Sequence, residues 1–466
     1  MAKGLSNKKN RAEKSRILEL FGKHISHGQV RYLRCAHLDM QEERRAGIKF
    51  VDKESGRTII DAFTSAGCFN VGRGNPAIIA ALEESLEKYD MGSFGLLSRP
   101  KIEFARKLVS LCPGDLNRMV FAGSGADAID GALKLALGAT GRKEVISMIK
   151  AYHGHSGFSL SANGKEYYKH LFEPLIPGFR FAPFGDLQTA EKLASRNTAA
   201  VIIEPVQGEG GIHVGSDEYL KGLRTLCDRL GIMLIFDEIQ TGLGRTGRLW
   251  GSEHSGVIPD IMVVAKSISG GLYPNAAIVY RDIELLTKFI EAHPDFHPTS
   301  GGCSDLGCSV SSKVLDYLME NRIWENAART GARFKAGLEA ITRENPKIVK
   351  EVRGRGLMIG VEYKYEFIGA LIADCLAKEG IWAAYSGNAP QVMRFQIPTI
   401  ATDGDIDEIL LKMRRAVKAM KPYLVLMMPL ARIPLLRKVF DNLKVQIVAF
   451  NLVRDLEEVL KPIGGR

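Results

Sequence analysis

The sequence lacks three features that would identify other classes of protein. Its seven cysteines are scattered and form no CxxC pair, which argues against a structural zinc site and against a disulfide framework. The N-terminal stretch MAKGLSNKKNRAEK has no apolar core of the kind found in signal peptides, and no apolar run is long enough to span a bilayer. These absences predict a protein of a reducing, cytoplasmic compartment without a metal site.

The body of the chain also lacks an excess of charge of either sign. Of the net charge of +10, residues 1–50 carry 12 Lys or Arg against 5 Asp or Glu, and residues 420–466 carry 8 against 4. Because basicity belongs to the two ends, no general nucleic-acid-binding surface is expected. The 45% hydrophobic and 25% charged content is typical of a globular protein, and 466 residues predict two or more domains.

Two short apolar runs each end close to an ionisable residue. Residues 233–236 (MLIF) lead to Asp237, and residues 261–265 (IMVVA) lead to Lys266. Runs that are apolar on both faces are typical of strands buried in a parallel sheet. Ligands of open α/β sheets bind outside the carboxyl ends of the strands, so both residues are expected near a ligand. A salt bridge between two strands is the plain alternative.

A lysine and an aspartate in this arrangement suit pyridoxal 5′-phosphate (PLP). That cofactor needs a lysine amine for covalent attachment and a carboxylate to keep its ring nitrogen protonated. The segments around both residues, DEIQTGLGRTGR and PDIMVVAKSISGGLYP, resemble the core motifs of the class III (omega) aminotransferases, which are PLP enzymes of fold type I. SISGGLYP most resembles the ornithine and acetylornithine aminotransferase branch. The resemblance runs from about residue 47 to about residue 418.

The resemblance implies an α/β fold, with a large domain around a mostly parallel sheet and a small α/β domain built from both chain ends. It implies a homodimer or larger oligomer with active sites at the subunit interface. The expected division is a basic N-terminal extension, two small-domain segments that flank the large PLP-binding domain, and an apolar and basic C-terminal extension. Their bounds are 1–46, 47–95, 96–325, 326–420 and 421–466.

The stretch RMVFAGSGADAIDGALKLAL reads as a strand, a glycine-rich turn and a helix. Free amides at a helix start can bind an anion. A plain turn is one alternative, and a dinucleotide site is another, although the acid that it requires is misplaced, since Glu144 precedes the next strand. In the resembling family this loop holds the PLP phosphate, which implies Ser124, Gly125 and Ala126. Because Ala126 lacks the family's hydroxyl, backbone amides must contribute more.

The resemblance assigns roles to further residues across the chain. On the residues alone, each could be an ordinary core or rim side chain. The resemblance implies that Tyr152 stacks on the PLP ring with His153 beside it, that Glu204 is the acid of the EP motif, and that Gln240 binds the ring hydroxyl. It also implies that Thr299 contacts the neighbouring subunit's PLP phosphate, that Glu209 gates the substrate, and that Arg394 binds the substrate carboxylate.

The implied activity is ping-pong transamination from an omega-amine or amino-acid donor to a 2-oxo acid such as 2-oxoglutarate or pyruvate. Lys266 would serve as covalent anchor and general base, which requires burial to lower the pKa of its amine. Two alternatives remain open at this point. One is a PLP-dependent aminomutase of the glutamate-1-semialdehyde type, and the other is a PLP-fold protein that binds without turnover.

The C-terminal extension suggests a peripheral membrane contact. Residues 423–436 are almost continuously apolar, and a helix from residue 435 would place hydrophobic side chains on one face with lysines and arginines at its border. Such a helix can lie in a membrane interface. The alternatives are packing against the enzyme itself and docking of a partner protein.

Co-sedimentation with anionic liposomes at low salt tests this expectation. The full chain should pellet with the vesicles, because its apolar face and cations both favour the interface, whereas a version ending at Met420 should stay in solution. If both remain in the supernatant, the membrane interpretation fails.

Overall fold

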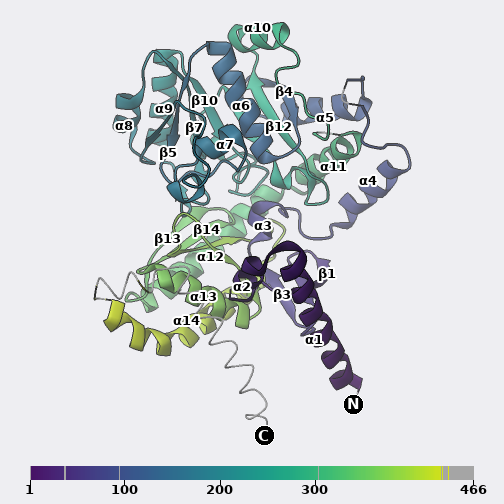
Figure 1. Ribbon diagram of the computed structural model, residues 1–466, viewed down its shortest axis with the longest axis vertical. Coiled ribbons are helices and arrows are strands. Elements are labelled where there is room, and N and C mark those ends of the chain that lie inside the picture. The colour runs from purple at the N-terminus through teal and green to yellow at the C-terminus, as the bar shows by residue number, and fades with distance from the viewer. Residues whose placement is uncertain are drawn as a thin grey trace.

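The computed structural model describes residues 2–35, 38–93, 95–302 and 304–431, together with residues 433 and 439. Figure 1 shows two lobes, an upper one built around a large sheet and a lower one formed by the first and last described segments of the chain. The α/β architecture predicted from the sequence is confirmed.

The upper lobe is built on a seven-stranded sheet in the order β4-β12-β11-β10-β7-β5-β6. Strand β12 alone in this sheet runs against its neighbours, and the other strands share one direction. The predicted parallel pairing of the runs that lead to Asp237 and Lys266 is therefore confirmed. The strands are β4 (Leu116–Ala122), β5 (Glu144–Met148), β6 (Phe179–Ala182), β7 (Thr198–Ile203), β10 (Met233–Asp237), β11 (Ile261–Val264) and β12 (Ala276–Arg281).

Helices cover both faces of this sheet because its strands are apolar on both sides. Ile202 and Ile235 point to the face covered by α6, and Val201 and Leu234 point to the opposite face. Helices α7 and α10 pack against α6, while α8 and α9, with α5 and α11 beside them, cover the opposite face. The bounds are α4 (Pro76–Leu86), α5 (Arg99–Ser110), α6 (Gly125–Thr140), α7 (Gly157–Ala162), α8 (Leu187–Leu193), α9 (Asp217–Leu230), α10 (Glu284–Ala292) and α11 (Asp305–Asn321). Shorter elements are α3 (Thr64–Gly67), η2 (Glu166–Tyr168), β8 (Val206–Gln207), β9 (His213–Val214), η3 (Gly251–His254) and η4 (Lys266–Ser269).

The lower lobe joins segments from both halves of the chain. The predicted hairpin after residue 47 forms as β2 and β3, and β3 pairs in parallel with β15, which comes from the C-terminal part of the chain. A second sheet has the order β13-β14-β17-β16 and packs against α12, α13 and α14. The elements are β1 (Glu42–Ala46), β2 (Lys49–Asp52), β3 (Thr58–Asp61), α12 (Ile323–Glu344), β13 (Val349–Arg355), β14 (Met358–Tyr363), α13 (Glu366–Lys378), β15 (Ile381–Trp382), β16 (Ala384–Tyr385), β17 (Val392–Gln396) and α14 (Asp403–Ala431).

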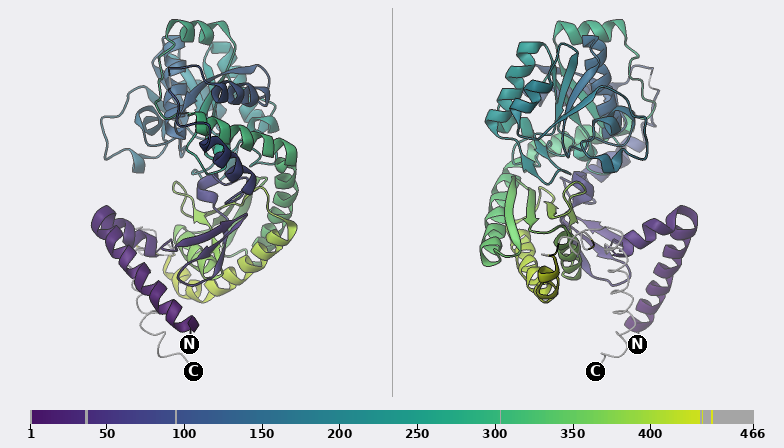
Figure 2. Two further views of the ribbon diagram at one scale, coloured as in Figure 1. Left: turned by 90° about the vertical axis from the view of Figure 1, so that its right-hand side faces the viewer. Right: turned by 60° about the vertical axis from the view of Figure 1, so that its left-hand side comes forward.

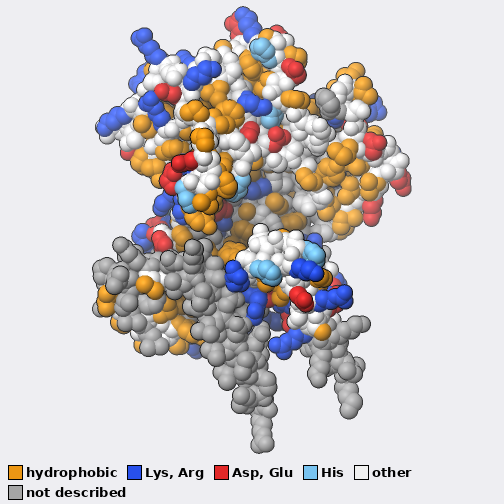
Figure 3. All heavy atoms as spheres, in the orientation of Figure 1, with side chains coloured by type: hydrophobic (Ala, Val, Ile, Leu, Met, Phe, Trp, Pro, Cys, Tyr) orange, Lys and Arg blue, Asp and Glu red, His pale blue; other side chains and the backbone are white. Residues whose placement is uncertain are grey.

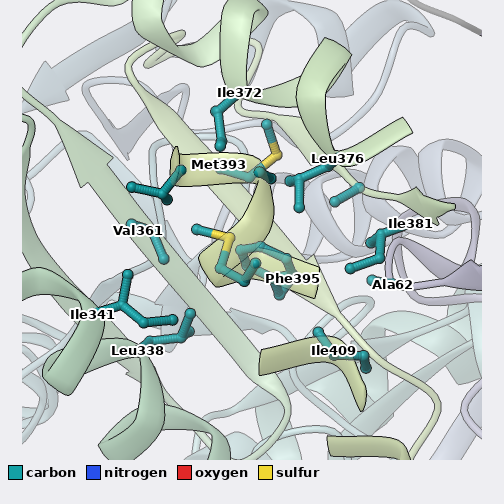
Figure 4. Packing of buried hydrophobic residues seen from close by; sticks show 14 of the residues in the cluster. Ala62, Leu338, Ile341, Val361, Ile372, Leu376, Ile381, Met393, Phe395 and Ile409 are labelled. Carbon is teal, nitrogen blue, oxygen red and sulfur yellow. The ribbon is translucent and has the colours of Figure 1, made fainter. Parts of the chain in front are cut away.

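Strand β17 lies at the centre of this lobe. Figure 4 shows Met393 and Phe395 pointing from β17 into a cluster that includes Val361, Leu376 and Ile409. Both β17 side chains are fully buried. Since successive side chains of a strand point to opposite faces, Arg394 and Gln396 must point the other way.

The N-terminal segment forms an arm that projects from the lower lobe. It consists of α1 (Ala2–Phe21), the π-helical turn η1 (Gly22–Ser26) and α2 (His27–Cys35), and Figure 2 shows the bend between the two helices. Near its middle, Lys14 forms ion pairs with Asp39 (3.1 Å) and Glu54 (2.6 Å) at the base of the lobe. Among the described helices, none combines the length and the apolar character needed to cross a membrane.

Two domain boundaries expected from the sequence fall inside helices. The boundary at 325 lies within α12, because the chain turns earlier, at Arg322, whose φ of 45° separates α11 from α12. The boundary at 420 lies within α14, whose last turns stay helical because Leu424 and Ala431 are buried against the lower-lobe core. Most of the amphipathic segment from residue 435 onward lies outside the described residues.

Candidate active site

A cavity of about 720 Å³ opens at the carboxyl ends of the parallel strands. Its walls contain most of the residues that the sequence singled out: Ser124, Gly125, Ala126, Tyr152, His153, Glu204, Asp237, Gln240 and Lys266. Thr299, Glu209 and Arg394 do not line this cavity. The topology thus brings together residues up to 142 positions apart because the parallel strands β4, β5, β7, β10 and β11 end at the same edge of the sheet.

Asp237 is the buried carboxylate of the cavity. Its side chain is 5% exposed, and its Oδ2 lies 2.7 Å from Nδ1 of His153, which is fully buried. Because an ionised carboxylate only accepts hydrogen bonds, Nδ1 carries the proton. The backbone amide of Ile239 donates to Oδ1 at 3.0 Å. These two donors fix the plane of the carboxylate at the end of β10.

Lys266 follows β11 at the start of η4 and has a φ of 51°. A positive φ is uncommon for a residue with a side chain and marks a functional constraint. Burial lowers the pKa of the Lys266 amine, partly opposed by the nearby acidic groups Cys68, Asp237 and Glu209. A lower pKa leaves more of the amine uncharged at neutral pH, which is the form that acts as nucleophile and base.

The glycine-rich turn between β4 and α6 leaves helix-start amides available to an anion. Ser124 caps the helix and accepts a hydrogen bond from the amide of Asp127 (3.2 Å), while the Asp127 carboxylate accepts from the amide of Gly123 (2.8 Å). These two hydrogen bonds occupy the amides of Gly123 and Asp127. The amides of Gly125 and Ala126 lie in the first turn of α6, beside the cavity. Such amides bind phosphate well.

Tyr152 and Glu204 form a wall of the cavity. Glu204 is 5% exposed and accepts hydrogen bonds from the amides of Tyr152 (3.2 Å) and Gly208 (2.8 Å). Burial raises the pKa of its carboxyl group. The Tyr152 ring stands edge-on to His155 and to Tyr168, with centroids 5.4 and 5.7 Å apart. Glu204 thus orients the backbone of Tyr152, whose ring lines the cavity.

Glu209 and Arg394 form a buried ion pair outside the lining of the main cavity. Arg394 Nη1 lies 2.6 Å from Glu209 Oε1, and the Arg394 side chain is 3% exposed. The amide of Gly387 donates to Glu209 Oε2 at 3.0 Å. The Glu209 carboxylate is near enough to affect the Lys266 amine electrostatically. In this structure the charge of Arg394 is therefore neutralised by Glu209 of the same chain.

Thr299 belongs to a different surface. It lines a groove of about 710 Å³ together with hydrophobic residues such as Leu96, Leu97 and Ile102. Its hydroxyl accepts a hydrogen bond from the amide of Gly302 at 3.2 Å. Thr299 does not line the cavity that contains Lys266, but its hydroxyl would lie 3.5 Å from a methyl group added to Gly123, which does line it.

Several lining residues were missed by the sequence analysis. Ser65, Cys68 and Phe69 reach the cavity from the turn after β3, where Thr64, Ser65 and Ala66 all have positive φ. Gln396, which does not line the cavity, was also missed, although it donates a hydrogen bond to the lining residue Gln240. Its position two residues after Arg394 on one strand is the signal that could have found it.

The residues present fit PLP. The helix-start amides suit its phosphate, the Asp237 carboxylate suits a protonated ring nitrogen, and Lys266 supplies the amine. The buried Nε2 of His153 has no hydrogen-bond partner among the described residues, so this cavity wall keeps a polar atom for a bound molecule. A cavity of this size accommodates a cofactor together with a small substrate.

Comparisons with known proteins agree with this geometry. The family model described as Aminotransferase class-III matches residues 34–417. An uncharacterized aminotransferase of Archaeoglobus fulgidus is 38% identical over 415 residues, which cover 89% of this chain and 96% of the relative.

Solved structures resemble the whole fold. An ornithine aminotransferase from Toxoplasma gondii, with partial occupancy of PLP at its active site, has a TM-score of 0.76 and 28% identity over 82% of this chain and 91% of its own. An (S)-enantioselective omega-transaminase from Thermomicrobium roseum has a TM-score of 0.76 and 30% identity over 82% of this chain and 93% of its own.

Proposed function

The chain belongs to the class III aminotransferases, PLP-dependent transaminases of fold type I, and we propose from that premise that it works by a ping-pong cycle. In that cycle an omega-amine or amino-acid donor gives its amino group to the enzyme, and a 2-oxo acid, 2-oxoglutarate or pyruvate, then takes it. The observation that carries this proposal is the buried Glu209–Arg394 pair near Lys266.

The ion pair suits a site that must accept two unlike substrates in turn. A 2-oxo acid brings a carboxylate, which Arg394 binds by charge-assisted hydrogen bonds once Glu209 has moved away. An amine donor without that carboxylate meets Arg394 already neutralised by Glu209. Because an unpaired buried charge is strongly unfavourable, one of the two arrangements is always required.

The residues around the cavity divide the remaining work. PLP, when bound, supplies an electron sink for the proton removed from the substrate carbon. Asp237, oriented by His153, would keep a proton on the ring nitrogen. Lys266 would anchor the cofactor covalently and carry the substrate proton at Nζ. Tyr152 lines one side of the cavity, and the amides at the start of α6 would hold the phosphate.

The relatives support this proposal at the level of substrate class. Ornithine aminotransferases and omega-transaminases are both among the similar structures. Both names describe transfer of an amino group. The choice between ornithine-like and simple amine donors rests on the pocket around Glu209 and Arg394.

Covalent capture tests the role of Lys266. Borohydride reduction of the PLP-loaded protein should fix the cofactor on Lys266, because the amine at this strand end is the one that faces the cavity. K266A should still bind PLP through the remaining contacts but lose turnover by several orders of magnitude.

Lys165 provides a matched control, because it is also partly buried and burial also lowers its pKa. The variant K165A should be labelled on Lys266 like the wild type. Peptide mapping that finds the reduced cofactor on another lysine would exclude the proposed role.

Acceptor preference tests the ion pair. R394A should raise KM for 2-oxoglutarate by roughly 10- to 100-fold, since it removes charge-assisted hydrogen bonds, and should leave an uncharged aldehyde acceptor almost unaffected. E209A should slow omega-amine donors selectively, because it leaves Arg394 unpaired when they bind.

Arg353 serves as the control for these variants, because it lies on the same small-domain sheet but pairs with Glu351 and Glu362, whereas Arg394 pairs with Glu209. R353A should affect charged and uncharged acceptors equally. Equal effects in R394A would remove the assignment of the carboxylate site.

We also propose that the enzyme is a homodimer in which the groove around Thr299 is the contact surface. Figure 3 shows hydrophobic side chains gathered over α4 and α5, and Leu86, Leu96, Leu97 and Ile102 are between 59% and 98% exposed. Exposed apolar patches of this kind mark association sites. A second copy docked there would bring Thr299 close to the neighbouring cavity.

Sedimentation analysis tests the proposed dimer. The wild type should have twice the mass of one chain, and L97E should be a monomer with weakened PLP affinity, since a charge in an apolar interface is unfavourable. V425E alters a residue that is 74% exposed on α14 and should remain dimeric. A monomeric wild type would contradict the proposal.

A further inference from the structure

Gln396 is a fully buried amide on the strand that carries Arg394. Met393 and Phe395 occupy the other face of β17, inside the lower-lobe core (Figure 4). Because this packing fixes the strand, the Gln396 side chain is directed out of the core towards the upper lobe. A polar side chain held in this way needs a polar partner.

That partner is Gln240, a lining residue of the cavity. Gln396 Nε2 donates to Gln240 Oε1 at 2.8 Å, and Gln240 is 8% exposed. The hydrogen bond occupies the carbonyl end of the Gln240 amide. The amino end of Gln240 is thereby left available to whatever occupies the cavity.

The other end of the Gln396 amide, its Oε1, is buried and has no hydrogen-bond partner among the described residues. The hydrogen bond to Gln240 through Nε2 is therefore the side-chain contact by which Gln396 acts on the cavity lining.

We propose that Gln396 is a positioning residue that turns the amide of Gln240 so that its amino group faces the hydroxyl oxygen of the PLP ring. This inference rests on the proposed role of Gln240 at that oxygen. It adds a lower-lobe residue, 156 positions away from Gln240 in sequence, to the control of the cofactor's acid-base state. Gln396 itself does not line the cavity.

The expected consequence concerns the proton shared by the ring oxygen of bound PLP. A hydrogen-bond donor at that oxygen stabilises the form that has lost the proton. When Gln396 is removed, the Gln240 amide can rotate and present its own oxygen, so the donor is lost part of the time. The pKa that governs the visible absorbance of the bound cofactor should therefore rise.

The experiment combines two substitutions of similar volume, Q396M and Q240M, and the double variant. In each PLP-loaded protein the visible absorbance is titrated with pH, and the dissociation constant of PLP is measured on the apo-protein. Both single variants should raise the apparent pKa by about one pH unit and weaken PLP binding several-fold. The double variant should match Q240M alone, because Gln396 acts through Gln240.

Thr399 supplies the control for a purely structural effect. It is fully buried beyond β17, and its hydroxyl donates to the Asn70 carbonyl at 2.9 Å, away from the cavity lining. T399V should lower thermal stability and leave the absorbance pKa unchanged.

Two results would overturn the inference. One is an unchanged pKa in Q396M, and the other is a shift in the double variant equal to the sum of the single shifts. An unchanged pKa in Q240M would overturn it together with the proposed role of Gln240, whereas transamination itself is tested separately at Lys266.

Discussion

The buried carboxylate of Asp237 is the constraint on which the rest of the site depends. A carboxylate that is 5% exposed is unfavourable unless hydrogen-bond donors or a cation compensate for the lost water. His153 and the Ile239 amide supply that compensation in part. In the role proposed for Asp237, a protonated ring nitrogen of the cofactor would supply a further partner, and the burial that is unfavourable for the carboxylate alone would strengthen that interaction.

Buried polar side chains also hold the two lobes together at their junction. Arg245 of the upper lobe is fully buried, donates to the carbonyls of Leu357 and Ile397, and also contacts Asn70. Burial lowers its pKa to about 9. At the same junction, Arg394 and Gln396 reach from the lower lobe to Glu209 and Gln240 of the upper lobe. In the roles proposed for these residues, substrate recognition and cofactor support depend on how the lobes meet.

The central chemistry could be predicted from the sequence because it follows local patterns. The apolar runs before Asp237 and Lys266 identify two strands, and parallel strands end at one edge of a sheet. The structure confirms both strands and their parallel pairing. The turn before α6 was likewise visible as a glycine-rich break between an apolar run and an amphipathic helix.

Other features of the site depend on contacts between residues that are far apart in the sequence, which no local pattern predicts. Gln396 and Gln240 meet only because the two lobes pack together, and Glu209 meets Arg394 in the same way. The boundaries expected at 325 and 420 fall inside α12 and α14, whose ends are set by a turn at Arg322 and by burial of Leu424 and Ala431. Thr299 lines a groove beside the cavity and not the cavity itself, and no local sequence pattern indicates this position.

The role of Asp237 is tested most directly by the rate of the first half-reaction, in which an amine donor converts PLP to its amino form without any acceptor. D237A should bind PLP but react at least about 100-fold more slowly than the wild type, since a positioned charge partner is typically worth about 3 kcal/mol of the barrier. Asp260, equally buried and paired with Arg224 at the opposite end of the strands, provides the control D260A, which should keep the wild-type rate. A near-normal rate in D237A would contradict the central claim.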